Sequence, residues 1–131
     1  MEEDVKKKLR DLFDDMLTKV GEFKRKTYSD VFEEGYGIYK SLPEEIAGLC
    51  EEAEEDRREE LVEELALVIP DYALGKIGER SKKEKDQLYV DFNLNMAVYV
   101  VPVLNYSGNE WCEKLAKRMV ELSVSYTHLR A

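Results

Sequence analysis

Apolar side chains recur every three or four residues along the first part of the chain, and this spacing constrains the fold more than any other feature. They stand at Val5, Leu9, Leu12, Phe13, Met16, Val20 and Phe23, with Lys, Arg, Asp and Glu between them. A period of 3.6 residues places them on one face of an amphipathic helix, which must bury that face against other elements. The chain therefore has to fold as a packed domain that is built largely of helices.

The same period continues downstream. It predicts a helix over about 43–54, with Ile46, Leu49 and Cys50 inward, and another over about 57–69, with Leu61, Val62, Leu65, Val68 and Ile69 inward. Pro70 predicts a boundary, followed by a short helix over 71–76 and a stop at Gly78. A last helix is expected from Gly108 to about Leu122, burying Trp111, Leu115 and Met119.

Three Ser-x-x-Glu strings stand before these apolar runs. They are Ser41–Glu44, Ser81–Glu84 and Ser107–Glu110. In a capping box the serine oxygen accepts the amide of the third helical residue, while the glutamate accepts the amide of the serine. The three strings, each in register with the hydrophobic period, predict three helix starts.

The segment from Ser81 to Leu104 reads in two ways. Within residues 92–101 the side chains alternate between apolar and polar or are β-branched and aromatic, as in a strand. The whole stretch, however, lacks a turn signal and is far longer than a usual strand. As a helix it is apolar on two faces, which is typical of a buried helix. We therefore expect an all-α single domain of five or six helices around a central buried helix at about 82–104, with helix or strand at 92–101 left open.

Size and composition agree with a soluble domain. The 131 residues correspond to one domain, and 44% of them are hydrophobic, which is enough for a core without a disulfide or a metal. The longest apolar run, from Met96 to Leu104, is about half of what a membrane span requires. We expect no contact with a membrane.

The net charge of −9 is concentrated in one stretch. Between Glu44 and Glu64 there are eleven acids and only two bases, Arg57 and Arg58, whereas the rest of the chain is neutral. Such a surface repels phosphates, so we expect no binding to nucleic acid. Residues 44–64 leave open an acidic inhibitor or DNA mimic that binds a nucleic-acid-binding protein.

Two cysteines indicate the compartment. Cys50 and Cys112 are far apart, and neither belongs to a Cys-x-x-Cys pair of the kind used for zinc or redox chemistry. The start Met1-Glu2-Glu3-Asp4 lacks the basic and apolar regions of a signal peptide. Free thiols in the cytoplasm are the expected state, and a Cys50–Cys112 bridge in a secreted protein is the alternative.

After Leu122 the amphipathic pattern gives way to β-prone residues without a glycine or asparagine stop. The chain ends Val124-Ser125-Tyr126-Thr127-His128-Leu129-Arg130-Ala131. Residues 124–131 resemble the translated end of a transposase adapter that is used to prepare sequencing libraries. The resemblance implies that 124–131 are a non-native tail that includes the single histidine, His128. Residues 1–123 are then expected to be a helical domain at the N-terminus of a longer chain.

No catalytic constellation is evident in residues 1–123. Without His128 there is no histidine to activate a thiol, and Cys50 is expected to be buried and inert. Cys112, at a helix start, is the better candidate for a reactive thiol, although packing is favoured there too. The acidic run lacks the spacing of a calcium loop or a di-iron site, and no glycine-rich phosphate loop is present. We expect neither a metal nor a cofactor.

An aromatic series gives the best candidate for a binding surface. It comprises Tyr28, Phe32, Tyr36 and Tyr39, interrupted by Gly35 and Gly37. Tyrosine is enriched at interfaces, so these four residues are candidate contacts with a protein or peptide partner. The sequence favours a non-enzymatic interaction domain, or the N-terminal module of a longer protein. An enzyme whose catalytic residues lie further along the natural chain is the alternative.

Overall fold

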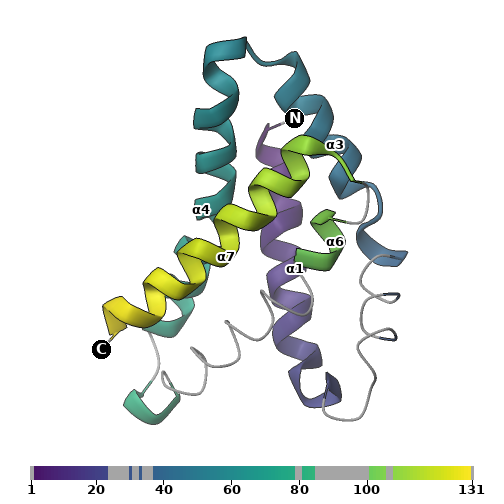
Figure 1. Cartoon of the computed structure of the whole chain (residues 1–131). Helices are drawn as coiled ribbons and strands as arrows, with labels where there is room; N and C mark the ends of the chain where they lie inside the picture. The colour runs from purple at the N-terminus through teal and green to yellow at the C-terminus, as the bar shows by residue number, and fades with distance from the viewer. Residues whose placement is uncertain are drawn as a thin grey trace.

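The computed structural model describes residues 2–23, 30, 33, 37–78, 81–84, 101–105 and 108–130, and within them the fold is all-α (Figure 1). The helical segments are α1 (Glu2–Phe23), α3 (Leu42–Glu52), the 3₁₀ turn η1 (Glu55–Arg57), α4 (Arg58–Gly78), α6 (Val101–Asn105) and α7 (Glu110–Arg130). No strand occurs in these ranges, and the prediction of an all-α single domain is confirmed.

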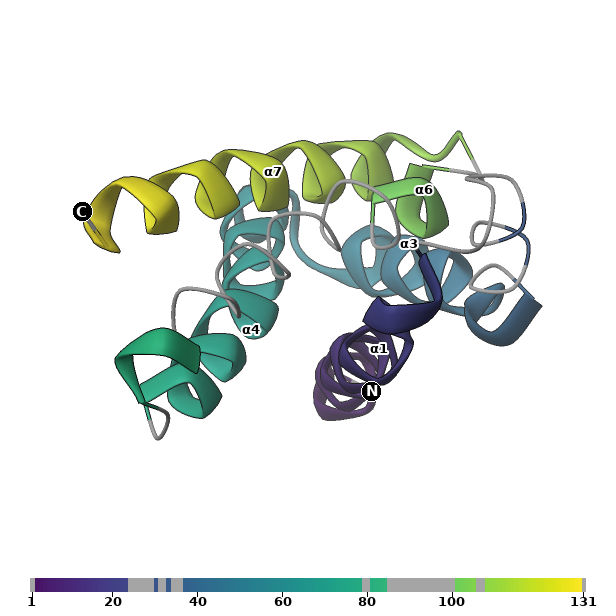
Figure 2. The ribbon, with the colours of Figure 1, turned by 90° about the horizontal axis from the view of Figure 1, so that it is seen from below.

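A hairpin of α3 and α4, joined by η1, forms the middle of the structure. Helix α1 contacts both helices of the hairpin, and α7 also contacts both. In Figure 2, α7 lies on one side of the hairpin and α1 on the other. Helix α4, in contact with α1, α3 and α7, is therefore covered from several directions. The short helix α6 packs against α7 and α3.

The core forms where these helices meet. From α1 it receives Val5, Leu9, Leu12 and Phe13, each at most 2% exposed, as the sequence period predicts. The inward residues predicted for α3, α4 and α7 are also buried or partly buried against it. The fully buried positions of the other helices include Leu42, Ile46, Cys50, Leu65, Ala66, Ile69, Val103, Leu104, Cys112, Leu115, Ala116 and Met119.

The predicted boundary at Pro70 is wrong. Helix α4 continues through Pro70 without interruption and ends at Gly78, the expected stop. A proline inside a helix removes one backbone hydrogen bond and costs about 3 kcal/mol in a bare helix. Here Pro70 is buried and its neighbours along the core face, Ile69 and Ala73, are buried too. The packing of α4 against α1 and α7 outweighs the cost of the hydrogen bond lost at Pro70. Helix propensities do not include this packing energy.

The three predicted capping boxes have different outcomes. At Ser81 the box forms, because the Ser81 amide donates to Glu84 Oε2 at 3.1 Å and the Glu84 amide donates to Ser81 Oγ at 3.4 Å. At Ser41 the side chain makes no capping bond, because its backbone is already helical (φ −80°, ψ −18°). Its carbonyl instead accepts the Glu45 amide at 3.1 Å.

An asparagine caps the start of α7. Ser107 lies outside the described residues, and Asn109 caps α7, with its Oδ1 accepting the amides of Trp111 at 2.9 Å and Cys112 at 3.3 Å. Gly108 precedes it at φ +69°, a conformation that favours glycine. The helix therefore starts at Glu110, and the predicted start at Gly108 is two residues early.

Helix α7 also runs further than expected. Its backbone stays helical to Arg130, beyond the predicted end near Leu122. The sequence has no glycine, asparagine or proline after Leu122 to terminate the helix. That residues 124–131 are a non-native tail stays a prediction.

Most of the predicted central helix lies outside the described residues. Within 82–104, the backbone is helical at 82–84 and from Val101 onward, where α6 begins. Residues 85–100 are not among those described, so the question of helix or strand at 92–101 stays open for all but Val101. Pro102 lies in the first turn of α6, where no amide is needed, and Val103 and Leu104 are fully buried.

Two leucines of α4 test this packing. Leu65 is fully buried, whereas Leu67 is partly exposed and lies outside the core cluster. We expect Leu65→Ala to lower the free energy of unfolding by about 2–5 kcal/mol, because it leaves a cavity in the core. The matched control Leu67→Ala should cost clearly less. Urea denaturation followed by circular dichroism measures both, and equal losses would contradict the orientation of α4.

Candidate functional site

The structure describes one of the four predicted partner-binding aromatics. Tyr39 is 8% exposed and belongs to the core, and its hydroxyl donates a hydrogen bond to the Asp15 carboxylate. Its ring thus packs between helices instead of offering an exposed surface. Tyr28, Phe32 and Tyr36 lie outside the described residues, and their role as partner contacts stays a prediction.

Both cysteines are free and fully buried. Burial raises the pKa of the Cys50 thiol above its usual value, as expected for an inert cysteine. The Cys112 thiol, in the first turn of α7, donates to the Pro43 carbonyl oxygen at 3.2 Å. This bond links α7 to the start of α3. Neither environment is typical of a nucleophile.

The acidic run from Glu44 to Glu64 divides into two parts. Five of its glutamates form ion pairs with bases elsewhere in the fold or in the run: Glu45 with Lys8, Glu59 with Lys114, Glu63 with Arg118, and both Glu60 and Glu64 with Arg57. The acids of residues 51–56, at the tip of the hairpin, are exposed. Among the described residues no group of three or more His, Cys, Asp or Glu could hold a metal ion.

An ion-pair strip connects α4 with α7. The Arg118 guanidinium donates to both carboxylate oxygens of Glu63, at 2.7 and 2.9 Å. Next to it, Lys114 pairs with Glu59 at 3.1 Å and lies 4.6 Å from the centroid of the Trp111 ring. A hollow of about 280 Å³ lies over this strip. Because its charges satisfy one another, we assign the strip to helix pairing.

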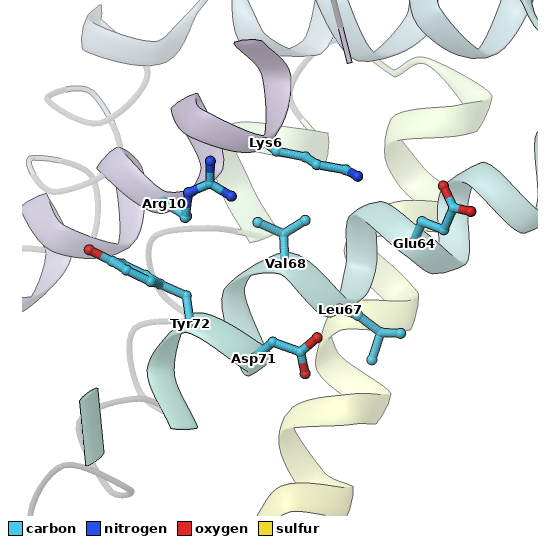
Figure 3. A pocket seen from close by; sticks show the side chains of 7 residues that line it. All are labelled: Lys6, Arg10, Glu64, Leu67, Val68, Asp71 and Tyr72. Carbon is cyan, nitrogen blue, oxygen red and sulfur yellow. The ribbon is translucent and has the colours of Figure 1, made fainter. Parts of the chain in front are cut away.

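A larger groove of about 560 Å³ lies between α1 and α4 (Figure 3). Its walls come from two helices that contact each other along the core. Two cations reach into it from α1, and five residues face it from α4. The lining residues are Lys6, Arg10, Glu64, Leu67, Val68, Asp71 and Tyr72.

Helical spacing brings these side chains together. Lys6 and Arg10 are four residues apart and so lie on one face of α1, beside the buried stripe that contains Leu9. On α4 the spacing of three and four residues between Glu64, Leu67, Val68, Asp71 and Tyr72 does the same. The groove is the rim of the α1–α4 contact, where both helices turn from core to surface.

Tyr72 fixes one end of the groove. Its ring packs edge-on against Phe13, with centroids 5.9 Å apart, and its hydroxyl donates to Asp14 Oδ2 at 2.8 Å. Val68 is partly buried against the core and points from α4 toward the two cations in Figure 3. Contacts with α1 at the ring and the hydroxyl hold Tyr72 in place, so this end of the groove is rigid.

The charged groups of the groove differ in how they are neutralised. Lys6 lies 3.4 Å from Glu2 Oε1, and Glu64 lies 3.2 Å from Arg57 Nη2. The hydrogen bond from Arg57 lowers the pKa of Glu64, so that carboxylate stays ionised and is suited to charge pairing. Arg10 makes no ion pair with any residue that the structure describes, and it is only partly exposed.

Comparisons with protein-family models, with curated proteins and with solved structures gave no match. The description of the site therefore depends on its geometry. None of the helices in the described ranges has the length and apolar character needed to cross a bilayer.

The sequence pattern does not predict the groove. One signal was present: Leu67 falls outside the inward stripe of α4 that contains Leu65, Val68 and Ile69, so an apolar residue was left on a polar face. A second was the Lys6/Arg10 spacing on α1. Neither indicates a site until the pairing of α1 with α4 is known.

The Glu63–Arg118 pair predicts a dependence of stability on pH. The hydrogen bond from Arg118 lowers the pKa of Glu63 in the folded state. The pair therefore stabilises the fold above about pH 5 and loses this effect as the pH falls through the lowered pKa. Thermal unfolding should show Glu63→Gln less stable than the wild type at pH 7, by a small margin because both side chains are partly exposed.

That difference should shrink as the pH falls below about 5 and through the lowered pKa. Glu54→Gln is the matched control, because Glu54 is exposed and makes no ion pair within the described part of the chain. A Glu63→Gln difference that stays constant from pH 7 to pH 3 would contradict the ion-pair explanation.

Proposed function

We propose that this domain is a non-enzymatic interaction module that binds a peptide segment of a partner protein in the α1–α4 groove. The observation that carries the proposal is the groove itself, in which the α1 wall bears cations and the α4 wall bears both acids and apolar side chains. Its volume of about 560 Å³ falls within the usual range of about 300–1,000 Å³ for binding pockets.

The apolar part of the groove supports a side-chain ligand. Leu67 is partly exposed on the α4 wall, and Val68 is partly covered from below by the core. An aliphatic side chain of a partner would remove apolar surface of both residues from water, which contributes about 25 cal/mol per Å² buried. Charged groups on either side would then orient the peptide, as polar groups do in most binding pockets.

The rigidity of the walls also supports binding. Both walls are helices of more than twenty residues whose opposite faces lie in the core. Sites on packed helices hold their side chains in more defined positions than sites on loops. A peptide would meet a surface that is already formed, which lowers the entropic cost of binding.

The alternatives have less support. Five glutamates of the acidic run form ion pairs within the protein, which weakens the case for an acidic inhibitor or DNA mimic. No specific observation supports the alternative of an enzyme whose catalytic residues lie further along a longer natural chain. Two buried free thiols fit a reducing compartment, and we propose a cytoplasmic location with neither nucleic acid nor membrane as partner.

A peptide-display selection tests the proposal. A random peptide library selected on the full chain should yield binders whose addition shifts the backbone amide NMR signals of α1 and α4 around Lys6, Leu67 and Tyr72. Leu67→Gln should weaken a selected peptide about tenfold, because apolar contact is lost. Val120→Gln, at an exposed apolar position on α7, is the matched control and should leave affinity unchanged.

Two results would contradict the proposal. One is a library that yields no peptide above background. The other is a set of peptides that shift the NMR signals of another face of the protein and bind Leu67→Gln as tightly as the wild type.

A further inference from the structure

Arg10 differs from the other arginines whose side chains are described. Arg57 donates to Glu64, Arg118 donates to Glu63, and Arg58 donates to the carbonyl oxygens of Ala53 and Glu51. Arg10 alone among them has no hydrogen-bond or ion-pair partner in the described part of the chain. It is also the one that lines the α1–α4 groove.

A partly buried guanidinium without a partner is unusual, because five N–H donors gain energy from an acceptor. The surroundings do not supply one. Asp14, one turn along α1, accepts the Tyr72 hydroxyl, and Glu64 on the facing wall is engaged by Arg57. In Figure 3 the carboxylate of Asp71 is turned away from α1. The donors of Arg10 therefore remain available to a ligand in the groove.

We infer that Arg10 selects the ligand of the groove by binding the carboxylate of an aspartate or glutamate in the partner peptide. An aliphatic residue next to that acid would pack on Leu67 and Val68. This inference rests on the proposed function. A carboxylate matches a guanidinium through two parallel hydrogen bonds, which gives direction as well as charge attraction.

Charge on the facing wall argues for a carboxylate and against a phosphate. Glu64 and Asp71 line the wall opposite Arg10. A phosphate group carries nearly two negative charges and would meet more repulsion from the Glu64 carboxylate than a single carboxylate would, as would a nucleic-acid backbone. A single carboxylate held by Arg10, with Lys6 one turn away on the same helix, meets less repulsion. The charge of Arg10 thus favours a peptide that places one carboxylate on its guanidinium.

The test compares peptide selections on four forms of the full chain: wild type, Arg10→Gln, Arg10→Glu and Lys7→Gln. Lys7→Gln is the matched control, because it removes the same charge from the same helix at a largely exposed site outside the groove. Peptides are fused to the display protein at their C-termini, so that no free terminal carboxylate is present. Circular dichroism verifies the helix content of every variant.

Wild type and Lys7→Gln should enrich peptides with Asp or Glu beside an aliphatic residue, and Arg10→Glu should enrich Lys or Arg at that position. For the best synthetic peptide, changing its acid to the amide should weaken binding to the wild type about tenfold. The same change should have little effect on binding to Arg10→Gln, as in a double-mutant cycle.

Peptides that map to the groove without acidic preference, or that bind Arg10→Gln as tightly as wild type, would overturn this inference and leave the proposed function intact. Tighter binding of a free C-terminal carboxylate, or of a phosphopeptide, than of the internal acid would also overturn it. Failure to obtain any groove-binding peptide would overturn both.

Discussion

The burial of the α3–α4 hairpin on two sides is the constraint on which the rest of the structure depends. Helix α7 places Leu115, Ala116 and Met119, all fully buried, on one side of the hairpin, and α1 places Leu9, Leu12 and Phe13 on the other. Hydrophobic burial of this kind is the main favourable term in folding. The polar contacts, such as Arg118 with Glu63 and Cys112 with Pro43, then fix the register of helices already pressed together.

The groove is a consequence of this arrangement. Helix α4 supplies residues to both sides, with Leu65 and Ile69 in the core and Leu67 and Asp71 at the surface. The surface residues of α4 that adjoin the core lie next to the side of α1 that bears Lys6 and Arg10. Groove-lining residues and core residues thus alternate along the same helices, so the groove keeps its geometry as long as the core stays packed.

The sequence predicted those features that depend on neighbours along the chain. The apolar period of α1 identified Val5, Leu9 and Phe13 as core residues, and the Ser81–Glu84 string identified a helix start. It failed where distant contacts decide. Pro70 stays inside α4 because packing supports it, and Tyr39 is buried by its place among the helices. The candidate site could not be predicted, because it requires knowing that α1 and α4 are paired and that Arg10 has no partner among the residues that the structure describes.

The central claim is that α1 and α4 belong to one cooperative core that holds the groove at a fixed width. Native-state hydrogen exchange tests it most directly, because it reports the free energy of opening for each amide. The slowest amides of α1, near Leu9 and Leu12, should exchange with the same opening free energy as those near Leu65 in α4 and Leu115 in α7. If α1 opened at a markedly lower free energy than α4 and α7, one wall of the groove would detach on its own, and the account would be contradicted.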